Sequence, residues 1–179
     1  MGAKAGINLA SIGGDYVGGL DPRVSFHVGG LVEIPLMGKF AIQPELLYSS
    51  QGAKQGSYLG IDLGDYESKV ILDYINVPIM GKYYIIEGLS IELGPQIGIL
   101  INARNKGDDG DGSFDEDIKD GYNKLDVALG IGASYRLNNG VFFSVRFNKG
   151  FLDISNDDDE YFDGDDYYAY LLSFTRLLC

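Results

Sequence analysis

The sequence has very few of the residues that form covalent cross-links or histidine-based sites. Its single cysteine, Cys179, has no partner in the chain, which excludes a disulfide framework. As a terminal residue, Cys179 is also poorly placed to act as a nucleophile. The single histidine, His27, cannot form a two-histidine metal site or an acid–base relay. We therefore expect no enzyme and no cofactor.

Long apolar runs and basic clusters are also missing. No stretch of 18 consecutive apolar residues occurs, which excludes a transmembrane helix. Acidic residues outnumber basic ones by 26 to 14, and no basic patch is visible, so we expect no nucleic-acid partner. The segment 1–4 leads directly into a strand pattern without the apolar core of a signal peptide. We expect an exported protein to be represented here by its mature part.

The sequence does contain long alternations of apolar and polar residues. Along residues 89–102, Ile91, Leu93 and Ile97 share one face, whereas Glu92 and Gln96 share the other. A period of two predicts a β-strand. The alternation is long for a soluble strand of about 5–6 residues, but a tilted strand that crosses a bilayer needs roughly 9–11. This segment therefore predicts a membrane-crossing strand.

The same alternation recurs along the chain. It predicts eight strands, over residues 3–9, 24–34, 40–49, 74–83, 89–102, 125–136, 141–148 and 168–177. The connections alternate between long and short, so in an up-and-down meander all short turns gather at one end. We predict an all-β fold, an eight-stranded antiparallel up-and-down transmembrane β-barrel, as a single domain over residues 1–179. Pro44, Pro78 and Pro95 interrupt predicted strands, and we expect β-bulges there.

The polar face indicates which side lines the barrel interior. It is mostly Gly, Ser, Asn and Gln, which suit a crowded lumen, and we expect His27 to lie there too. Isolated charges of both signs on this face could pair across the lumen, as buried ions require. The predicted lumen charges are Glu33, Glu45, Lys82, Glu92, Asp126, Arg136 and Arg146. Eight strands enclose only enough room for side chains, so we expect a polar plug.

Several segments resemble a known family. They are QPELLYSSQGAK at 43–54, LDYINVPIMGKYY at 72–84 and GLSIELGPQIGIL at 88–100. These are similar to the porin-like outer-membrane β-barrel domain of Gram-negative bacteria, and the resemblance covers nearly the whole chain. It implies location in the bacterial outer membrane, contact with its lipid and lipopolysaccharide, and insertion by the barrel-assembly machinery. Family members usually finish with an aromatic residue, whereas this chain ends at Leu178-Cys179.

Two acidic segments are candidate ion sites. The first offers clustered carboxylate oxygens of the kind that Ca²⁺ prefers, from Asp109, Asp111, Asp115 and Asp117. It is not an EF-hand loop, because Phe114 stands where that loop requires glycine. The second contains the acids of 157–160 and 163–166. The alternative for both is a solvated loop that repels itself.

These observations favour a monomeric outer-membrane barrel with a structural, adhesive or surface-binding role carried by long acidic loops. One alternative is a narrow porin. Another is a soluble, lipocalin-like carrier, in which the apolar face would line the interior and bind an apolar ligand. The direction of Glu92 and Ile97 distinguishes the soluble carrier from a membrane barrel.

Overall fold

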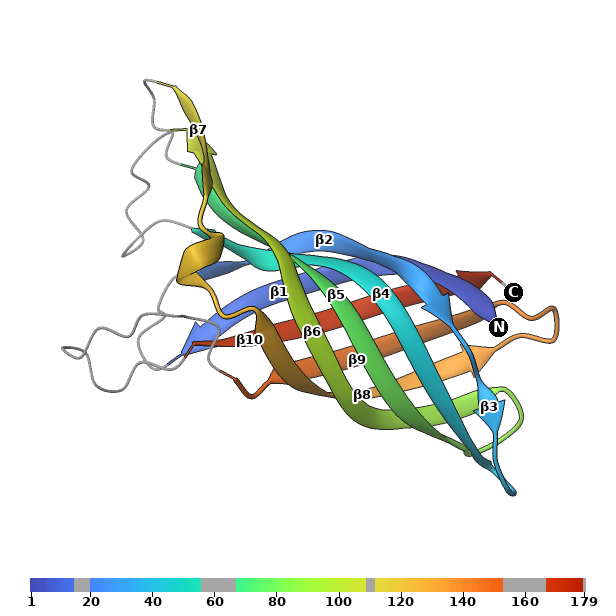
Figure 1. The fold of residues 1–179 in the computed structure, drawn as a ribbon. Coiled ribbons are helices and arrows are strands. Elements are labelled where there is room, and N and C mark those ends of the chain that lie inside the picture. Colours follow the sequence, from blue (N-terminus) through green and yellow to red (C-terminus); the bar gives the residue numbers. More distant parts are fainter. Residues whose placement is uncertain (15–19, 56–66, 109–111, 153–166, 179) are drawn as a thin grey trace.

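A computed structural model describes residues 1–14, 20–55, 67–108, 112–152 and 167–178 of the chain. Eight strands form a closed antiparallel barrel (Figure 1). They are β1 (Gly2–Gly14), β2 (Leu20–Leu31), β4 (Phe40–Gln55), β5 (Glu67–Tyr84), β6 (Leu89–Asp108), β8 (Leu125–Arg136), β9 (Phe142–Gly150) and β10 (Tyr167–Leu178). Each pairs with the next along the chain, and β1 pairs with β10 to close the ring. The predicted eight-stranded up-and-down barrel is confirmed.

Three smaller elements extend this barrel. Strand β3 (Ile34–Pro35) follows β2 and pairs with the start of β4, and strand β7 (Ser113–Asp117) pairs with the outer end of β6. A 3₁₀ turn, η2 (Lys119–Gly121), leads from β7 towards β8. The described residues contain no helix with the length and hydropathy needed to span a membrane.

The short connections lie at one end of the barrel, together with both termini (Figure 1). Each contains a glycine with positive φ, at Gly38, Gly88 and Gly140. Such a backbone conformation is strained for other residues, which explains the Asn-Asn-Gly signal at 138–140. A tight hydrogen bond of 2.7 Å from the Leu137 amide to the Val141 carbonyl closes that turn. The predicted gathering of short turns at one end is therefore confirmed.

Several strands are longer at the opposite end than the sequence predicts. Predicted strands ended at 49 and 102, yet β4 continues to Gln55 and β6 to Asp108. The connection between the strands predicted at 89–102 and 125–136 contains β7 and η2. Within this extension, Lys69 of β5 lies between Lys54 of β4 and Lys106 of β6 in the strand ladder. Apolar alternation stops where the outward face turns polar, whereas backbone hydrogen bonds continue beyond that point, so hydropathy alone underestimates the strand length.

The prediction of bulges at three prolines is wrong. The register is unchanged through Pro44, Pro78 and Pro95. Register shifts occur instead between residues 22 and 27 of β2 and between residues 73 and 74 of β5. A barrel residue directs its amide towards only one neighbouring strand, so a proline removes one ladder bond without requiring an extra residue. The Pro44 carbonyl still accepts a bond of 3.1 Å from the Val32 amide, opposite the break between β2 and β3.

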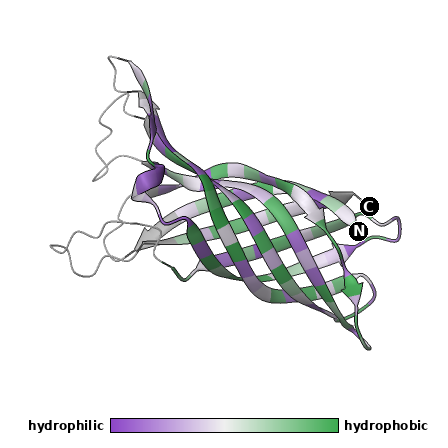
Figure 2. Cartoon of the chain, in the orientation of Figure 1, coloured by the Kyte–Doolittle hydropathy of each residue, from purple (hydrophilic) through white to green (hydrophobic). Residues whose placement is uncertain are grey.

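The two faces of the barrel differ sharply in character. On β6, Ile97 and Ile99 point outward and are 47% and 50% exposed, whereas Glu92 and Gln96 are 2% and 4% exposed. Figure 2 shows this alternation of hydrophobic and hydrophilic residues along the strands. From Ile91 to Ile101 the outward apolar residues span about 24 Å at a tilt of roughly 45°, close to the height of a lipid-facing band. The soluble-carrier alternative required the opposite arrangement and is excluded.

Candidate functional site

Four charged side chains meet in the middle of the lumen. Arg146 of β9 donates to both carboxylate oxygens of Glu45 on β4, over 2.7 and 3.0 Å. Strands β4 and β9 are separated by β5, β6 and β8 on one side and by β10, β1 and β2 on the other. The Arg146–Glu45 pair therefore crosses the full width of the barrel.

Two further ions complete this group. Arg146 Nε donates to Glu92 Oε1 over 2.8 Å, and Lys4 Nζ donates to Glu45 Oε2 over 2.8 Å. All four side chains are almost fully buried, and two cations balance two carboxylates. We call Lys4, Glu45, Glu92 and Arg146 the central ion network. Sequence reasoning missed Lys4, although it shares the inward face of β1 with Asn8.

A second group lies nearer the short-turn end. Glu33 accepts hydrogen bonds from Lys82 Nζ at 3.0 Å, from Tyr84 Oη at 2.7 Å and from Arg136 Nη2 at 2.7 Å. The side chain of Arg136 is 42% exposed, which places it at the rim of the barrel. Gln43 joins this group to the central ion network, because it accepts from Lys82 and donates to Glu45. Six of the seven predicted lumen charges, all except Asp126, therefore belong with Lys4 to one connected network.

Lumen glycines make room for these long side chains. A Cβ atom at Gly132 would lie 3.0 Å from Glu92 Oε1, and one at Gly130 would lie 2.5 Å from Asn148 Oδ1. Both glycines are on β8, beside Arg146 and Asn148 of β9 in the ladder. The small residues of the polar face therefore allow the larger polar residues to fill the lumen.

His27 lies in the next layer, towards the loop end. Its Nδ1 is 2.7 Å from Asn8 Oδ1, and its Nε2 is 3.0 Å from Thr175 Oγ1. Because Asn8 Oδ1 also accepts a bond from Ser173, the network assigns the proton to Nδ1 and makes Nε2 the acceptor. The ring rests over Gly6, where a Cβ atom would lie 2.5 Å from it. Both ring nitrogens are thus hydrogen-bonded to side chains of the lumen.

The outer layer of the lumen is apolar. Leu72, Tyr74, Leu100 and Ala103 form a buried cluster, against which Val70, Ile118, Tyr122 and Ala169 pack. We call the four buried residues the apolar cap. Alternation placed Leu100 on the polar face, but it did not reveal that the inward positions of β5 and β6 become hydrophobic at this level.

A small cavity lies between these layers. An interior cavity of about 10 Å³ lies among residues that include Asn8, His27, Asn76 and Arg146. That volume holds roughly one water molecule. Two side chains that line it, Asn76 and Asn148, each have an Oδ1 atom without a hydrogen-bond partner within the described part of the chain, as expected for groups that face such a water. Polar side chains and a volume of about one water molecule therefore occupy this level of the lumen.

The predicted Ca²⁺ ligands are only partly within the described residues. Asp109 and Asp111 lie outside them, as do the acids of 157–160 and 163–166. Asp115 is exposed and pairs with Lys106 at 2.8 Å and Arg104 at 3.3 Å, and its hydrogen bond with Lys106 lowers the pKa of its carboxyl. Asp117 Oδ1 accepts a bond from the Lys119 amide. Among the residues described, no three or more His, Cys, Asp or Glu side chains are placed so that they could hold a metal ion together. Ca²⁺ binding stays a prediction.

Known structures share this architecture. Neisserial surface protein A superposes with a TM-score of 0.59 at 11% identity, and the alignment covers 99% of this chain and 95% of that one. Ail, the attachment invasion locus protein of Yersinia pestis, superposes with a TM-score of 0.50 at 14% identity, with 99% and 97% covered. At these identities the likeness shows the fold. A comparison with curated protein sequences finds no significant match.

The family assignment comes from the sequence itself. The pattern that defines the outer membrane protein beta-barrel domain matches residues 1–156, which is most of the chain. This match agrees with the outward apolar band and the closed ring of strands. The chain belongs to the outer membrane protein beta-barrel domain family and is a protein of the bacterial outer membrane.

Proposed function

We propose that this protein is a closed membrane anchor that presents its long acidic connections as a binding surface, and that it does not conduct ions. The observation that supports the proposal best is the central ion network. Arg146 and Glu45 join opposite walls of the barrel through two hydrogen bonds, in the part of the lumen that an ion would have to cross.

Opening a path through this layer would require separating buried charges. Removal of one partner from such a pair typically costs about 3–5 kcal/mol, because the remaining charge stays buried. The apolar cap adds a second barrier on the loop side, where Leu72 and Leu100 are almost fully buried. The narrow-porin alternative needs both layers to move.

Planar-bilayer recording tests this closure. The purified protein is expected to give no discrete conductance steps, and a variant that lacks the plug, Glu45→Gly with Arg146→Gly, is expected to give small steps in the same assay. That variant serves as the control for insertion. Discrete steps from the unchanged protein would contradict a closed anchor.

The binding role is argued from charge and position. The far ends of β4, β5, β9 and β10 lie at the end of the barrel opposite the termini (Figure 1), and the sequence between 153 and 166 is rich in acids. With a formal net charge of −12, the chain favours a basic partner. A structure of Ail contains the heparin analogue sucrose octasulfate, a polyanion, and we expect the opposite preference here.

Surface retention measures that preference. Protein in lipid nanodiscs is expected to bind immobilised polylysine and not heparin, and deletion of 155–164 is expected to reduce the retention on polylysine by at least half. Binding to heparin, or retention that survives the deletion, would count against a role for the acidic connections.

A further inference from the structure

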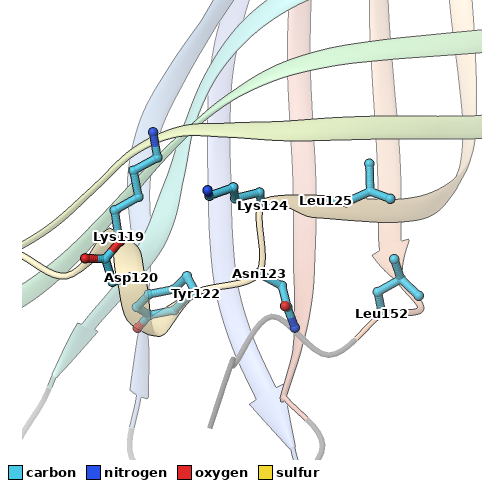
Figure 3. A pocket seen from close by; sticks show the side chains of 7 residues that line it. All are labelled: Lys119, Asp120, Tyr122, Asn123, Lys124, Leu125 and Leu152. Carbon is cyan, nitrogen blue, oxygen red and sulfur yellow. The ribbon is translucent and has the colours of Figure 1, made fainter. Parts of the chain in front are cut away.

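A pocket lies at the loop end of the barrel, beside the start of β8. Its volume is about 640 Å³, and it is lined by Lys119, Asp120, Tyr122, Asn123, Lys124, Leu125 and Leu152. Figure 3 shows Lys119, Asp120 and Tyr122 on one side of the pocket, with Leu125 and Leu152 on the other. The lining is therefore cationic and polar at one side and apolar at the other.

The pocket spans the upper boundary of the lipid-facing band. Leu125 is 50% exposed and begins the outward apolar row of β8, which continues through Leu129 and Ile131. Leu125 is paired with Ile99, one of the last outward apolar residues of β6. Lys124 comes directly before Leu125 in the chain, on the loop side of this row. A bilayer changes from hydrocarbon to headgroups over the same short distance, about 5–8 Å on each side of the core.

Both lysines are placed at this boundary by the backbone. Lys119 Nζ donates to the carbonyl of Ile101 over 2.9 Å, which holds its ammonium beside the outer end of β6. A lysine ammonium has three donors, so two remain for other acceptors. The Lys124 carbonyl accepts a bond of 2.8 Å from the Leu100 amide, which fixes the chain at the root of the second lysine. Among the described residues that line the pocket, two lysines accompany one carboxylate, that of Asp120.

We propose that this pocket binds a phosphorylated lipid of the outer leaflet, of the lipid A type. The phosphate accepts hydrogen bonds from the ammonium groups of Lys119 and Lys124, and the acyl chains lie along Leu125 and Leu152. A soluble anion would use only the lysines, and an uncharged lipid would use only the leucines. A phosphorylated lipid matches both sides, and it is present where the pocket meets the membrane. This inference does not depend on whether the lumen conducts.

Lipid titration of the whole chain tests the proposal. The protein in detergent micelles is titrated with diphosphoryl lipid A, with dephosphorylated lipid A and with inorganic phosphate, and bound lipid is measured by native mass spectrometry. We expect Lys119→Gln with Lys124→Gln to weaken binding of diphosphoryl lipid A by about thirtyfold, and Lys124→Gln alone by about fivefold. The double variant Lys119→Arg with Lys124→Arg keeps both charges and is expected to bind within about threefold of the unchanged protein.

Lys39 provides a matched control. It too donates from Nζ to a backbone carbonyl, that of Ile85 at 3.1 Å, but in the turn between β5 and β6 at the short-turn end. Lys39→Gln is expected to leave lipid A binding unchanged, and Leu125→Ser is expected to weaken it without altering the shift in apparent size of the folded barrel on unheated gels. The proposal is overturned if dephosphorylated lipid binds equally well, if inorganic phosphate displaces the lipid at equal concentration, or if the glutamine pair binds like the unchanged protein.

Discussion

Two layers of side chains occupy the same lumen by different physical means. The central ion network places Lys4, Glu45, Glu92 and Arg146 in contact, each almost fully buried. The apolar cap, nearer the loop end, consists of Leu72, Tyr74, Leu100 and Ala103. In the first layer, each side chain needs a particular partner of opposite charge. In the second, the side chains need only to fill the volume.

This difference predicts different tolerance to substitution. A buried ion that loses its partner keeps its desolvation cost, so changes in the central ion network are severe and depend on which partner remains. An apolar layer accepts another hydrophobic side chain of similar volume at a cost usually below about 1.5 kcal/mol. The lumen therefore combines a layer that is specific with a layer that is tolerant.

Loss of Arg146 is the largest expected effect. Arg146→Met leaves Glu92 without its hydrogen-bond partner and Glu45 with Lys4 as its one remaining cation in the central ion network. We expect the free energy of unfolding to fall by about 3–5 kcal/mol, because two carboxylates lose a shared cation inside the barrel. Urea unfolding from lipid vesicles measures it.

The matched controls for Arg146 are a charge on the outside and a second change inside. Lys149→Met on the exposed face of β9 is expected to change the free energy of unfolding by less than about 0.5 kcal/mol. Adding Glu92→Gln to Arg146→Met is expected to recover part of the loss, because the unpaired carboxylate disappears. An Arg146→Met protein as stable as the Lys149→Met protein would show that the central ion network contributes little.

Substitutions at Leu100 come next. Leu100→Ala is expected to cost about 2–3 kcal/mol through the cavity it leaves in the apolar cap, whereas Leu100→Met is expected to cost less than about 1.5 kcal/mol. The corresponding conservative change below, Arg146→Lys, cannot reproduce the two-pronged bond to Glu45 and is expected to cost more than Leu100→Met. The same vesicle unfolding experiment ranks the three proteins. Equal costs for Arg146→Lys and Leu100→Met would break the distinction between the two layers.

The sequence predicts the architecture well because the bilayer imposes a simple code. Outward isoleucines such as Ile97 and inward acids such as Glu92 must alternate, and turns such as 138–140 need residues that accept positive φ. Alternation also places Glu45, Glu92 and Arg146 on the inward face, although it did not lead to Lys4. It does not show that Arg146 reaches Glu45, because that contact depends on the closure of the ring between strands far apart in the sequence.

Other features escape prediction because hydropathy does not encode them. The extension of β6 to Asp108 is held by backbone hydrogen bonds, to which lysines and acids contribute as well as isoleucines do. The straight register through Pro95 depends on which neighbour each amide faces. The outer pocket depends on how η2 folds back beside β8, which brings Lys119 near Leu125.

The exposed ion pairs of Asp115 are the smallest expected effect, and they separate the role of charge from the role of burial. Lys106 and Arg104 hold the pKa of Asp115 below its ordinary value, so these pairs contribute at neutral pH and are lost only as the pH falls through that lowered pKa. Lys106→Gln is expected to raise the pKa of Asp115 towards its ordinary value, as measured by carbon-detected NMR titration, with no detectable change in vesicle unfolding, because solvent screens exposed pairs. Lys69→Gln, one strand away, is the control and is expected to shift the pKa less. A loss of stability from Lys106→Gln comparable to that from Arg146→Met would mean that charge pairing, and not its burial in the lumen, determines the strength of these contacts.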